Sequence, residues 1–554
     1  MFYYKPEEIP SEERPVPASK LAGFGSFLGI YGGEHIAATE FVIGALLVTW
    51  GVKAGELIVG LVVGNLLAAS SYALVTAPIA VDTRLTLFAY LRKTTGPWFQ
   101  RAYNATWGVV SIIWAASMMA ISATSLKEAV GLPVQLEWYP TSIGCVALTL
   151  ALVAVTVVVG AYGFKGVVKF SSLCVPWMVA IFFCGAAVAL PLLCRKTDFG
   201  AVSGVGDFLR LLETHVFNGV VPDGRPHLTW VHVAAFAWMC GFVYHVGLND
   251  MSIFRYARRA SYGWVGLFGM FLGHFFAWIC AGVMGAAAAA VLGVSLQKLD
   301  SGAVTGAVIG WAGLFAVVVA GWTTATPNIY RAALSFATFF PKWSFRRLSF
   351  LVGAVIAFAA CFPAVMRIDM IANAAALLVP SVGALCLVEH WLFPKLGLVR
   401  HWNLYHGRML NPAAVAAWAV SALFALGGVL GEWMHPFFLP IPTFFVAGIA
   451  YPVFAALMGA RRAIDPEVRA KVDAIERRIG ELSIGAEKGE RVKGERVKGE
   501  WAAVLTAAAG LALALLVLGA LRCPERFRKS SVVYTAAYFV CATGAAFCRR
   551  EKKS

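Results

Sequence analysis

Apolar runs of about 20 residues recur along the whole chain, and they constrain the fold more than any other feature of the sequence. A run of this length crosses the hydrocarbon core of a bilayer as one helix. Backbone groups in lipid must find hydrogen-bond partners inside the protein, so helices and closed barrels are the structures that can cross. The runs are too long for barrel strands, and we therefore expect an all-α polytopic membrane protein.

Twelve such runs precede a charged segment at residues 461–500, and two more follow it. They lie near residues 22–50, 54–80, 97–125, 140–162, 168–194, 229–252, 260–292, 303–336, 346–363, 370–394, 411–431 and 438–459, then 501–521 and 531–548. We expect about twelve core transmembrane helices, with residues 195–228 as an external loop. The charged segment is predicted to be a cytoplasmic linker, and residues 501–554 to be a C-terminal transmembrane pair with its tail.

The composition agrees with lipid as the solvent, because 59% of the residues are hydrophobic and 14% are charged. In a soluble protein the formal net charge of +16 would suggest nucleic acid as a partner. Here the basic residues lie between the apolar runs, where they act as topology signals. We therefore expect the lipid bilayer as a partner and no nucleic acid.

The loops that lead from even-numbered to odd-numbered runs carry most of the basic residues between the core runs. These are Arg84, Arg92, Lys93, Arg101, Lys165, Lys169, Arg255, Arg258, Arg259, Lys342, Arg346, Arg347, Lys395, Arg400 and Arg408. The positive-inside rule then predicts a cytoplasmic N-terminal tail at residues 1–20 and a multi-pass protein of the cytoplasmic (inner) membrane. The basic residues at 522–529, in the last hairpin, would lie outside and depart from this rule.

Two of the runs are interrupted by glycines and polar residues at the same relative place. The first run holds Gly-Gly-Glu-His at 32–35, and the sixth holds a similar cluster at 241–250. Transporters built from inverted repeats place their site where one helix of each half is broken. The runs are five apart, which predicts repeats at 21–194 and 229–394 with discontinuous helices 1 and 6, followed by helices 11 and 12 at 395–460. Glycine that merely permits close helix packing is the alternative.

Ionisable side chains at membrane depth are expensive and usually functional. Glu40 follows the first interruption, and His245 lies within the second. We take both as candidate substrate ligands. Glu34 is a further candidate, unless the helix ends one turn earlier and Glu34 lies among the lipid headgroups.

The eighth run places three hydroxyls and an amide within two helical turns. They belong to Thr323, Thr324, Thr326 and Asn328, and Pro327 removes one backbone donor between them. Oxygen ligands of this kind suit a hard cation such as Na⁺. Threonine hydroxyls in membrane helices also bond back to their own carbonyls, which is the alternative here.

Aromatic residues accompany the two interruptions. Trp114 lies on the third run, and Phe242 follows Gly241 on the sixth. Such side chains can hold a planar ring between their faces. Tryptophan is also common at membrane interfaces, which is the simpler interpretation for Trp107 and Trp230.

Sequence signatures of enzymes are missing. The chain has no H-E-x-x-H, no G-x-S-x-G and no phosphate-binding glycine loop, and its eleven cysteines lack C-x-x-C spacing. The repeated filter elements of a channel are missing as well. We expect that the chain is not an enzyme and that it holds no cofactor apart from a Na⁺ ion.

Several phrases, taken in order, resemble the nucleobase:cation symporter-1 family, which includes cytosine permeases and hydantoin, allantoin and purine transporters. They are VGNLLA at 63–68, Phe-Arg-Tyr at 254–256, Trp-Thr-Thr at 322–324 with Asn-Ile-Tyr at 328–330, LVPSVGAL at 378–385, and Trp-Asn at 402–403 with Asn-Pro at 411–412. The resemblance covers about residues 20–460. It implies the leucine-transporter fold, a 5+5 inverted-repeat bundle that works by alternating access.

The resemblance also implies roles for residues of this chain. The family's cation site corresponds to the hydroxyls of Thr323 and Thr324 with backbone carbonyls near Ala37, Ala38 and Phe41. The ring of the substrate is held in the family by aromatic residues of helices 3 and 6. These correspond to Trp114 and to Phe242 beside Gly241.

Two departures from the cytosine-permease pattern argue against cytosine itself as the substrate. Ser111 stands where the cytosine-permease pattern has a glutamine, and residues 325–327 replace its Asn- and Asp-rich stretch. We include Ser111 and Asn328 among the expected substrate-binding residues. The sequence thus predicts uptake of a nucleobase or related heterocycle, of the cytosine, purine, hydantoin or allantoin class, coupled to Na⁺ or H⁺. The alternatives are a proton-coupled transporter of another small nitrogenous solute and a membrane sensor derived from a transporter.

Overall fold

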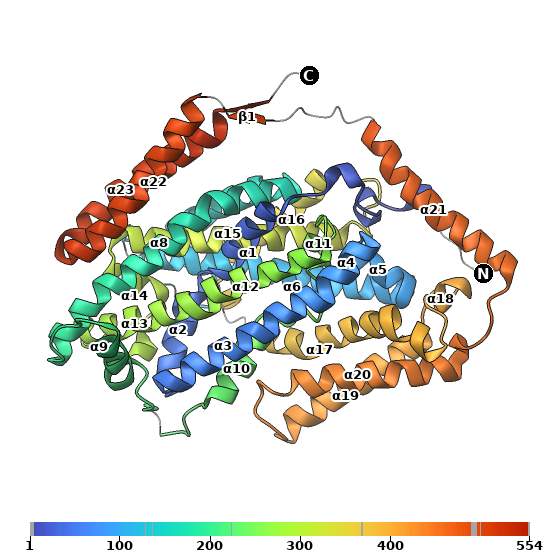
Figure 1. Ribbon diagram of the computed structural model, residues 1–554, viewed down its shortest axis with the longest axis horizontal. Coiled ribbons are helices and arrows are strands. Elements are labelled where there is room, and N and C mark those ends of the chain that lie inside the picture. Colours follow the sequence, from blue (N-terminus) through green and yellow to red (C-terminus); the bar gives the residue numbers. More distant parts are fainter. Residues whose placement is uncertain are drawn as a thin grey trace.

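The computed structural model is a bundle of helices (Figure 1). It describes residues 5–127, 129–133, 135, 137–222, 224–366, 369–488, 496–498 and 500–551. Residues 1–4 of the expected tail and residues 489–495 and 499 of the expected linker therefore lie outside the described residues. Within the described ranges the strands are β1 (Arg496–Lys498) and β2 (Arg549–Glu551), which pair antiparallel.

The predicted first repeat consists of eight α-helical segments. They are α1 (Phe24–His35), α2 (Thr39–Thr49), α3 (Ala54–Ser71), α4 (Ala77–Thr83), α5 (Leu87–Thr94), α6 (Pro97–Lys127), α7 (Ile143–Gly160) and α8 (Gly163–Thr197). A single π-helical turn joins α3 to α4, so these two segments form one long helix that can cross the membrane.

The predicted external loop contains α9 (Val205–Leu211), and the predicted second repeat follows it. Its segments are α10 (Trp230–Met239), α11 (Met251–Phe254), α12 (Val265–Met270), α13 (Trp278–Leu292), α14 (Ser301–Val308), α15 (Trp311–Phe336), α16 (Phe345–Ala360) and α17 (Asp369–Leu387). A π-helical turn joins α12 to α13 in the same way.

The remaining helices lie beyond the two predicted repeats. They are α18 (Trp402–Tyr405), α19 (Pro412–Leu430), α20 (Pro440–Ala455), α21 (Pro466–Lys488), α22 (Glu500–Arg522) and α23 (Pro524–Phe547). Asn411 caps α19, because its side-chain oxygen accepts from the backbone N–H groups of Ala413 and Ala414, and Pro412 occupies the first helical position.

Eleven of the described helices are long and apolar enough to cross a bilayer. The first and sixth predicted runs are absent from that group because each is split into two shorter helices, α1 with α2 and α10 with α11. The ninth run forms α16, which is 16 residues long. The predicted all-α architecture, with its discontinuous helices 1 and 6 and its C-terminal pair, is thus confirmed, and the chain is a multi-pass membrane protein.

The N-terminal segment closes one end of the bundle, which we call the N-terminal face. Glu13 is 3% exposed, and its carboxylate accepts hydrogen bonds from Arg92 at 3.3 Å, Gln100 at 3.1 Å and Thr338 at 2.5 Å. Arg255 donates to the Glu12 carbonyl at 2.8 Å. The segment therefore ties together α5, α6 and the residues that follow α11 and α15.

Helix α21 lies against the same face, near the N-terminus in Figure 1. Lys93 and Glu476 are 2.7 Å apart, and the Tyr405 hydroxyl donates to Asp473 at 3.2 Å. The side chains of Val472 and Ile479, which belong to α21, are buried. Burial raises the pKa of Glu476, but the positive charges of Lys93 and Arg92 outweigh burial and lower it. Within the expected linker, Pro466–Lys488 thus forms a helix that packs on the bundle.

The C-terminal pair packs against α8, at the edge of the bundle in Figure 1. The Trp177 indole N–H donates to the Thr535 hydroxyl at 3.1 Å, and the Tyr538 hydroxyl donates to the Leu173 carbonyl at 2.7 Å. Arg195 forms an ion pair with Glu525 at 2.8 Å. Three contacts spread along α8 therefore fix the hairpin to the core.

Candidate functional site

A cavity of about 960 Å³ enters the bundle from the side opposite the N-terminal face. Its mouth includes exposed Glu432 in the connection between α19 and α20, and its buried end includes Glu34, Tyr244 and Thr324. Its walls come from α2, α6, α10, α15, α17 and the loop after α10. The cavity therefore ends where both interrupted helices meet α15.

The first interruption lies later than the sequence suggested. Helix α1 continues through the predicted break at 32–35, and the chain leaves helical geometry at Ile36, with φ −99° and ψ 68°. The glycines instead permit close packing, because a Cβ on Gly32 would lie 2.9 Å from Val175 and one on Gly33 would lie 2.9 Å from Ser171. The predicted interruption is confirmed, but its predicted position is wrong by about one turn.

The second interruption lies where it was predicted. Helix α10 ends at Met239, and turns follow until α11 begins at Met251. Leu248 has a positive φ of 64°, a conformation that stops a helix. Gly383 of α17 lies against these turns, since a Cβ there would overlap the Val246 carbonyl oxygen and lie 2.8 Å from the Gly247 Cα. A larger residue at 383 would push α17 away from the break.

A buried ion triad joins the two interruptions to α15. Arg331 donates to both carboxylate oxygens of Glu34, at 2.5 and 3.0 Å, and to Asp250 at 2.5 Å. The Tyr31 hydroxyl donates to the other Asp250 oxygen at 2.6 Å. The Arg331 side chain is 0% exposed, and its guanidinium lies 4.5 Å from the centre of the Tyr244 ring.

Sequence reasoning missed Arg331, although a signal for it existed. Arg331 is the single charged residue in the eighth apolar run, and an ionisable residue at membrane depth is a functional candidate by default. His274, an ionisable residue within the seventh run, carried the same signal and was also missed. Asp250 was noticed only as part of the second polar cluster.

The expected cation ligands lie beside the first interruption. Thr323 donates to the carbonyls of Val319 and Ala320, both at 3.1 Å, and Thr324 donates to Ala320 at 3.0 Å. These back-bonds use the hydroxyl hydrogens and leave oxygen lone pairs free to coordinate an ion. A Cβ on Gly33 would lie 3.4 Å from the Thr323 Cβ, so α1 and α15 touch here.

One further oxygen belongs to this region. The Ser171 hydroxyl of α8 is buried and has no hydrogen-bond partner among the described residues, and it lies beside Gly33. Ala37 lines the cavity, while Ala38 and Phe41 are buried. The oxygen-rich set fits a monovalent cation, and within the described residues no group of three His, Cys, Asp or Glu side chains is placed to hold a metal.

Three of the expected substrate ligands line the cavity, namely Trp114, Gly241 and Glu40. Trp114 comes from α6 and Glu40 from the first turn of α2. The Glu40 carboxylate accepts a hydrogen bond from the Trp278 indole N–H. The cavity therefore brings together the third helix and both interruptions, as the predicted site requires.

Four others lie behind the wall of the cavity. Phe242 packs on Trp238, and the His245 ring nitrogen Nε2 lies 3.1 Å from the Trp238 carbonyl. Asn328 donates to the Thr324 carbonyl at 2.9 Å and accepts from the Tyr244 hydroxyl at 3.4 Å. Ser111 is buried without a hydrogen-bond partner among the described residues. Their expected role in substrate binding stays a prediction.

Two neighbouring histidines line the cavity, and one of them stacks on Trp278, the donor to Glu40. The rings of His35 and His274 have centroids 5.4 Å apart, and His274 stacks on Trp278 at 4.5 Å. Both histidines line the cavity. The His35 Nδ1 lies 2.8 Å from the Tyr31 carbonyl, so it carries the hydrogen and the other ring nitrogen, Nε2, keeps its lone pair.

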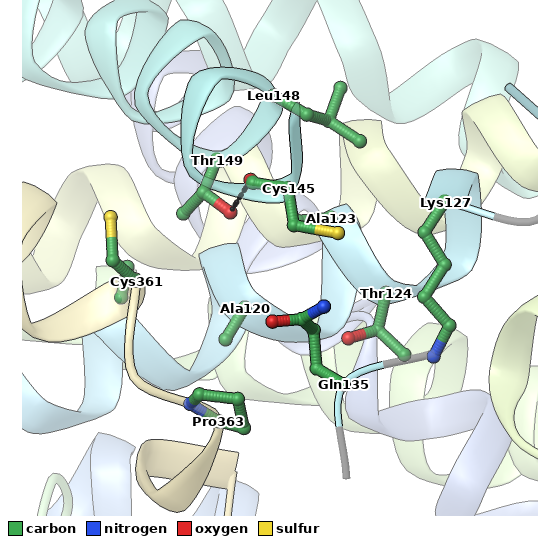
Figure 2. A pocket seen from close by; sticks show the side chains of 11 residues that line it. Ala120, Ala123, Thr124, Lys127, Gln135, Cys145, Leu148, Thr149, Cys361 and Pro363 are labelled. Atoms are coloured by element: carbon green, nitrogen blue, oxygen red, sulfur yellow. Dashed lines mark hydrogen bonds between the residues drawn. The ribbon is translucent and has the colours of Figure 1, made fainter. Parts of the chain in front are cut away.

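Two other cavities do not share this chemistry. Figure 2 shows a cavity of about 40 Å³ between α6, α7 and the end of α16, lined by Thr124, Gln135 and Cys145 among others, which has room for little more than water. A cavity of about 1130 Å³ between α8, α13 and the α22–α23 turn has a mostly apolar wall, and its Arg195 is paired with Glu525. Neither reaches an interrupted helix.

Comparison with protein-family models gave no match to the sequence, and no curated protein matches it either. Solved structures do match. Mhp1, described as a nucleobase-cation-symport-1 family transporter in a closed conformation with bromovinylhydantoin bound, has a TM-score of 0.62 and 15% identity, covering 85% of this chain and 98% of its own.

A second similar structure is a Na⁺-coupled sialic acid symporter in a substrate-bound outward-open state. Its TM-score is 0.59 at 12% identity, over 82% of this chain and 93% of that chain. MhsT in complex with L-phenylalanine has a TM-score of 0.50 at 14% identity, over 80% and 99% of the two chains. At these identities the likeness shows the fold, and the expected leucine-transporter-like bundle is confirmed.

Proposed function

We propose that this protein is a cation-coupled symporter that carries a nucleobase or a related small nitrogen heterocycle across a cytoplasmic membrane. The observation that carries the proposal is the cavity of about 960 Å³ that ends at both interrupted helices while the opposite end of the bundle is closed. A site reached from one side at a time is what alternating access requires. The similarity to Mhp1, a nucleobase-cation-symport-1 family transporter with bromovinylhydantoin bound, supports the substrate class.

The solute binds at the buried end of the cavity. Trp114 offers an aromatic face, and Gly241 leaves room beside it because it has no side chain. Tyr244 and Glu40 supply polar groups on either side. Phe242, His245 and Asn328 hold the second interruption and the Tyr244 hydroxyl in place from behind the cavity wall, and Ser111 offers an unused buried hydroxyl on α6.

The coupling cation binds between the first interruption and α15. Thr323 and Thr324 would hold it with the Ser171 hydroxyl and with carbonyls near Ala37, Ala38 and Phe41. A bound Na⁺ supplies positive charge that holds the interrupted helix against α15. Because the solute and the cation share this helix, each raises the affinity for the other by the same factor.

With the N-terminus in the cytoplasm, the structure is an outward-facing state. Release to the inside then requires the N-terminal face to open, which breaks the contacts of Glu13 with Arg92, Gln100 and Thr338. The Arg331 triad connects both interruptions to α15, so a movement at one interruption is transmitted to the other.

Uptake by proteoliposomes tests the proposal. We expect labelled cytosine, hypoxanthine or hydantoin to enter faster with an inward Na⁺ gradient than without one, and Thr323→Ala and Thr324→Ala to lower that dependence at least tenfold. The matched control is Thr305→Ala, because Thr305 is a buried threonine of α14 with the same kind of back-bond, to Ser301 at 2.8 Å, and it belongs neither to the cavity wall nor to the expected cation ligands. Failure of all three solutes to enter or to compete would refute the substrate class. Unchanged Na⁺ dependence in both variants would refute the cation site.

A further inference from the structure

The buried centre of the protein holds more carboxylates than cations. Glu34 and Asp250 share one guanidinium, that of Arg331, at distances of 2.5 to 3.0 Å. Glu40 is a third carboxylate, 3% exposed. Among the described residues that line the cavity none is a lysine or an arginine. A buried carboxyl without a cationic partner is costly to ionise, so a positively charged ligand at this centre would stabilise the ionised form of Glu40.

Glu40 is the carboxylate that a ligand can reach. The triad satisfies Glu34 with two hydrogen bonds and Asp250 with bonds from Arg331 and Tyr31. Within the described part of the chain no ion pair involves Glu40, whose carboxylate accepts hydrogen bonds from three neutral partners, the Trp278 indole, the Thr39 hydroxyl and the Ala37 backbone. Because Glu40 lines the cavity, its remaining acceptor capacity is available to a bound molecule.

A second polar group that lines the cavity, the imidazole of His274, also has an unused hydrogen-bonding atom. The His274 Nδ1 is buried without a hydrogen-bond partner among the described residues, and His274 lines the cavity at 6% exposure. The Nε2 of His35 keeps a lone pair on the neighbouring ring, 5.4 Å away between centroids. The wall near Glu40 therefore offers acceptors and lacks donors that carry charge.

An aromatic face completes this surface. Trp114 lines the same cavity, and a tryptophan face attracts a cation through its ring quadrupole. Glu432 at the mouth adds negative charge along the path of entry. Carboxylate, imidazole and indole together form a site for a planar cation with several N–H groups.

We propose that the solute site also accepts an organic cation, an amidine, a guanidine or a protonated amino-heterocycle, whose charged N–H groups pair with Glu40. This rests on the proposed function and adds positively charged nitrogen compounds to the heterocycles of its substrate class. Trp114 covers the face of the cation, and His274 accepts a further N–H.

Benzamidine and benzamide test this directly, because they have the same ring and nearly the same size and differ in charge. We expect the purified full-length protein, followed by tryptophan fluorescence and thermal shift, to bind benzamidine at least about tenfold more tightly than benzamide. Glu40→Gln should abolish this preference, so that benzamidine binds no more tightly than benzamide. Glu213→Gln is the matched control, since it removes the same charge from an exposed position that does not line the cavity, and it should change the preference less than about twofold.

Glu40→Asp keeps the charge and covers the case in which Glu40→Gln fails to fold; it should retain a preference for benzamidine. Equal binding of the two probes, or a preference that survives Glu40→Gln, would overturn the proposal. Na⁺-dependent uptake of cytosine by a wild-type protein that does not bind benzamidine would also overturn it while the symporter function stood. Benzamidine binding without Na⁺-dependent uptake of any solute would support the cationic site and refute the symporter.

Discussion

Replacing Arg331 by Gln leaves the carboxylates of Glu34 and Asp250 without the cation that both contact. Arg331 makes three short hydrogen bonds, at 2.5, 2.5 and 3.0 Å, and is 0% exposed. Removing one partner from a buried ion pair costs about 3–5 kcal/mol, because the remaining charges stay buried. The expected loss of folding stability is therefore large for a single substitution.

The expected change in melting temperature follows from the length of the chain. An unfolding entropy of about 2.1 cal/mol/K per residue gives roughly 1.2 kcal/mol/K for 554 residues. A loss of about 3–5 kcal/mol then lowers the melting temperature by about 3–4 °C. Scanning fluorimetry of the detergent-purified protein measures this shift, and uptake by proteoliposomes should fall to background in the same variant.

Two variants make the measurement decisive. Arg347→Gln removes an exposed arginine near the start of α16 and should stay within about 0.5 kcal/mol of the wild type. The triple change Glu34→Gln, Asp250→Asn and Arg331→Met removes all three charges, and it should recover most of the lost stability without recovering uptake. If Arg331→Gln melted like the wild type and still transported, the triad would not hold the two interruptions together.

Three further outcomes follow from other contacts. Gly383→Ala should destabilise by about 1–3 kcal/mol in thermal melts, because the added methyl group meets the Val246 carbonyl, whereas Gly448→Ala, whose Cβ would lie 3.6 Å from its nearest neighbour, should be neutral. Glu13→Gln removes the negative charge that Arg92 contacts, so the N-terminal face should open more often. A cysteine introduced on that face should then react faster with a thiol reagent. An unchanged labelling rate would show that Glu13 does not keep the face closed. The lowered pKa of Glu476 means that its contact with Lys93 is fully present above the ordinary glutamate pKa and is lost as pH falls through the lowered pKa of the folded protein, so the hydrogen-exchange protection factors of α21, measured relative to the intrinsic rates, should be smaller near pH 3 than at pH 7.

The architecture was predictable because it depends on local properties of the sequence. Hydrophobic runs report the crossing helices, and polar clusters five runs apart report the two interruptions. The first interruption was misplaced because glycine has two roles in membrane helices. At Gly32 and Gly33 it permits contact with α8, and the break follows at Ile36.

The centre of the site was less predictable because it joins residues far apart in the chain. Arg331 pairs with partners 297 and 81 residues away. Nothing in the local sequence of the eighth run says which carboxylates it meets. Thr323 and Thr324 were proposed as cation ligands from their spacing and stay a prediction, whereas the Ser171 hydroxyl came to light through the packing of Gly33 on α8.

The C-terminal pair has a mechanical consequence. Because α23 is bonded to α8 through Trp177 and Tyr538, α8 cannot shift without carrying the hairpin or breaking those bonds. The hairpin exposes apolar side chains such as Leu511 and Val540, at 61% and 71%, to the surrounding lipid. Any change in the tilt of α8 must therefore drag two extra helices through the bilayer. The thickness and viscosity of the membrane thus enter the energy and the rate of that motion.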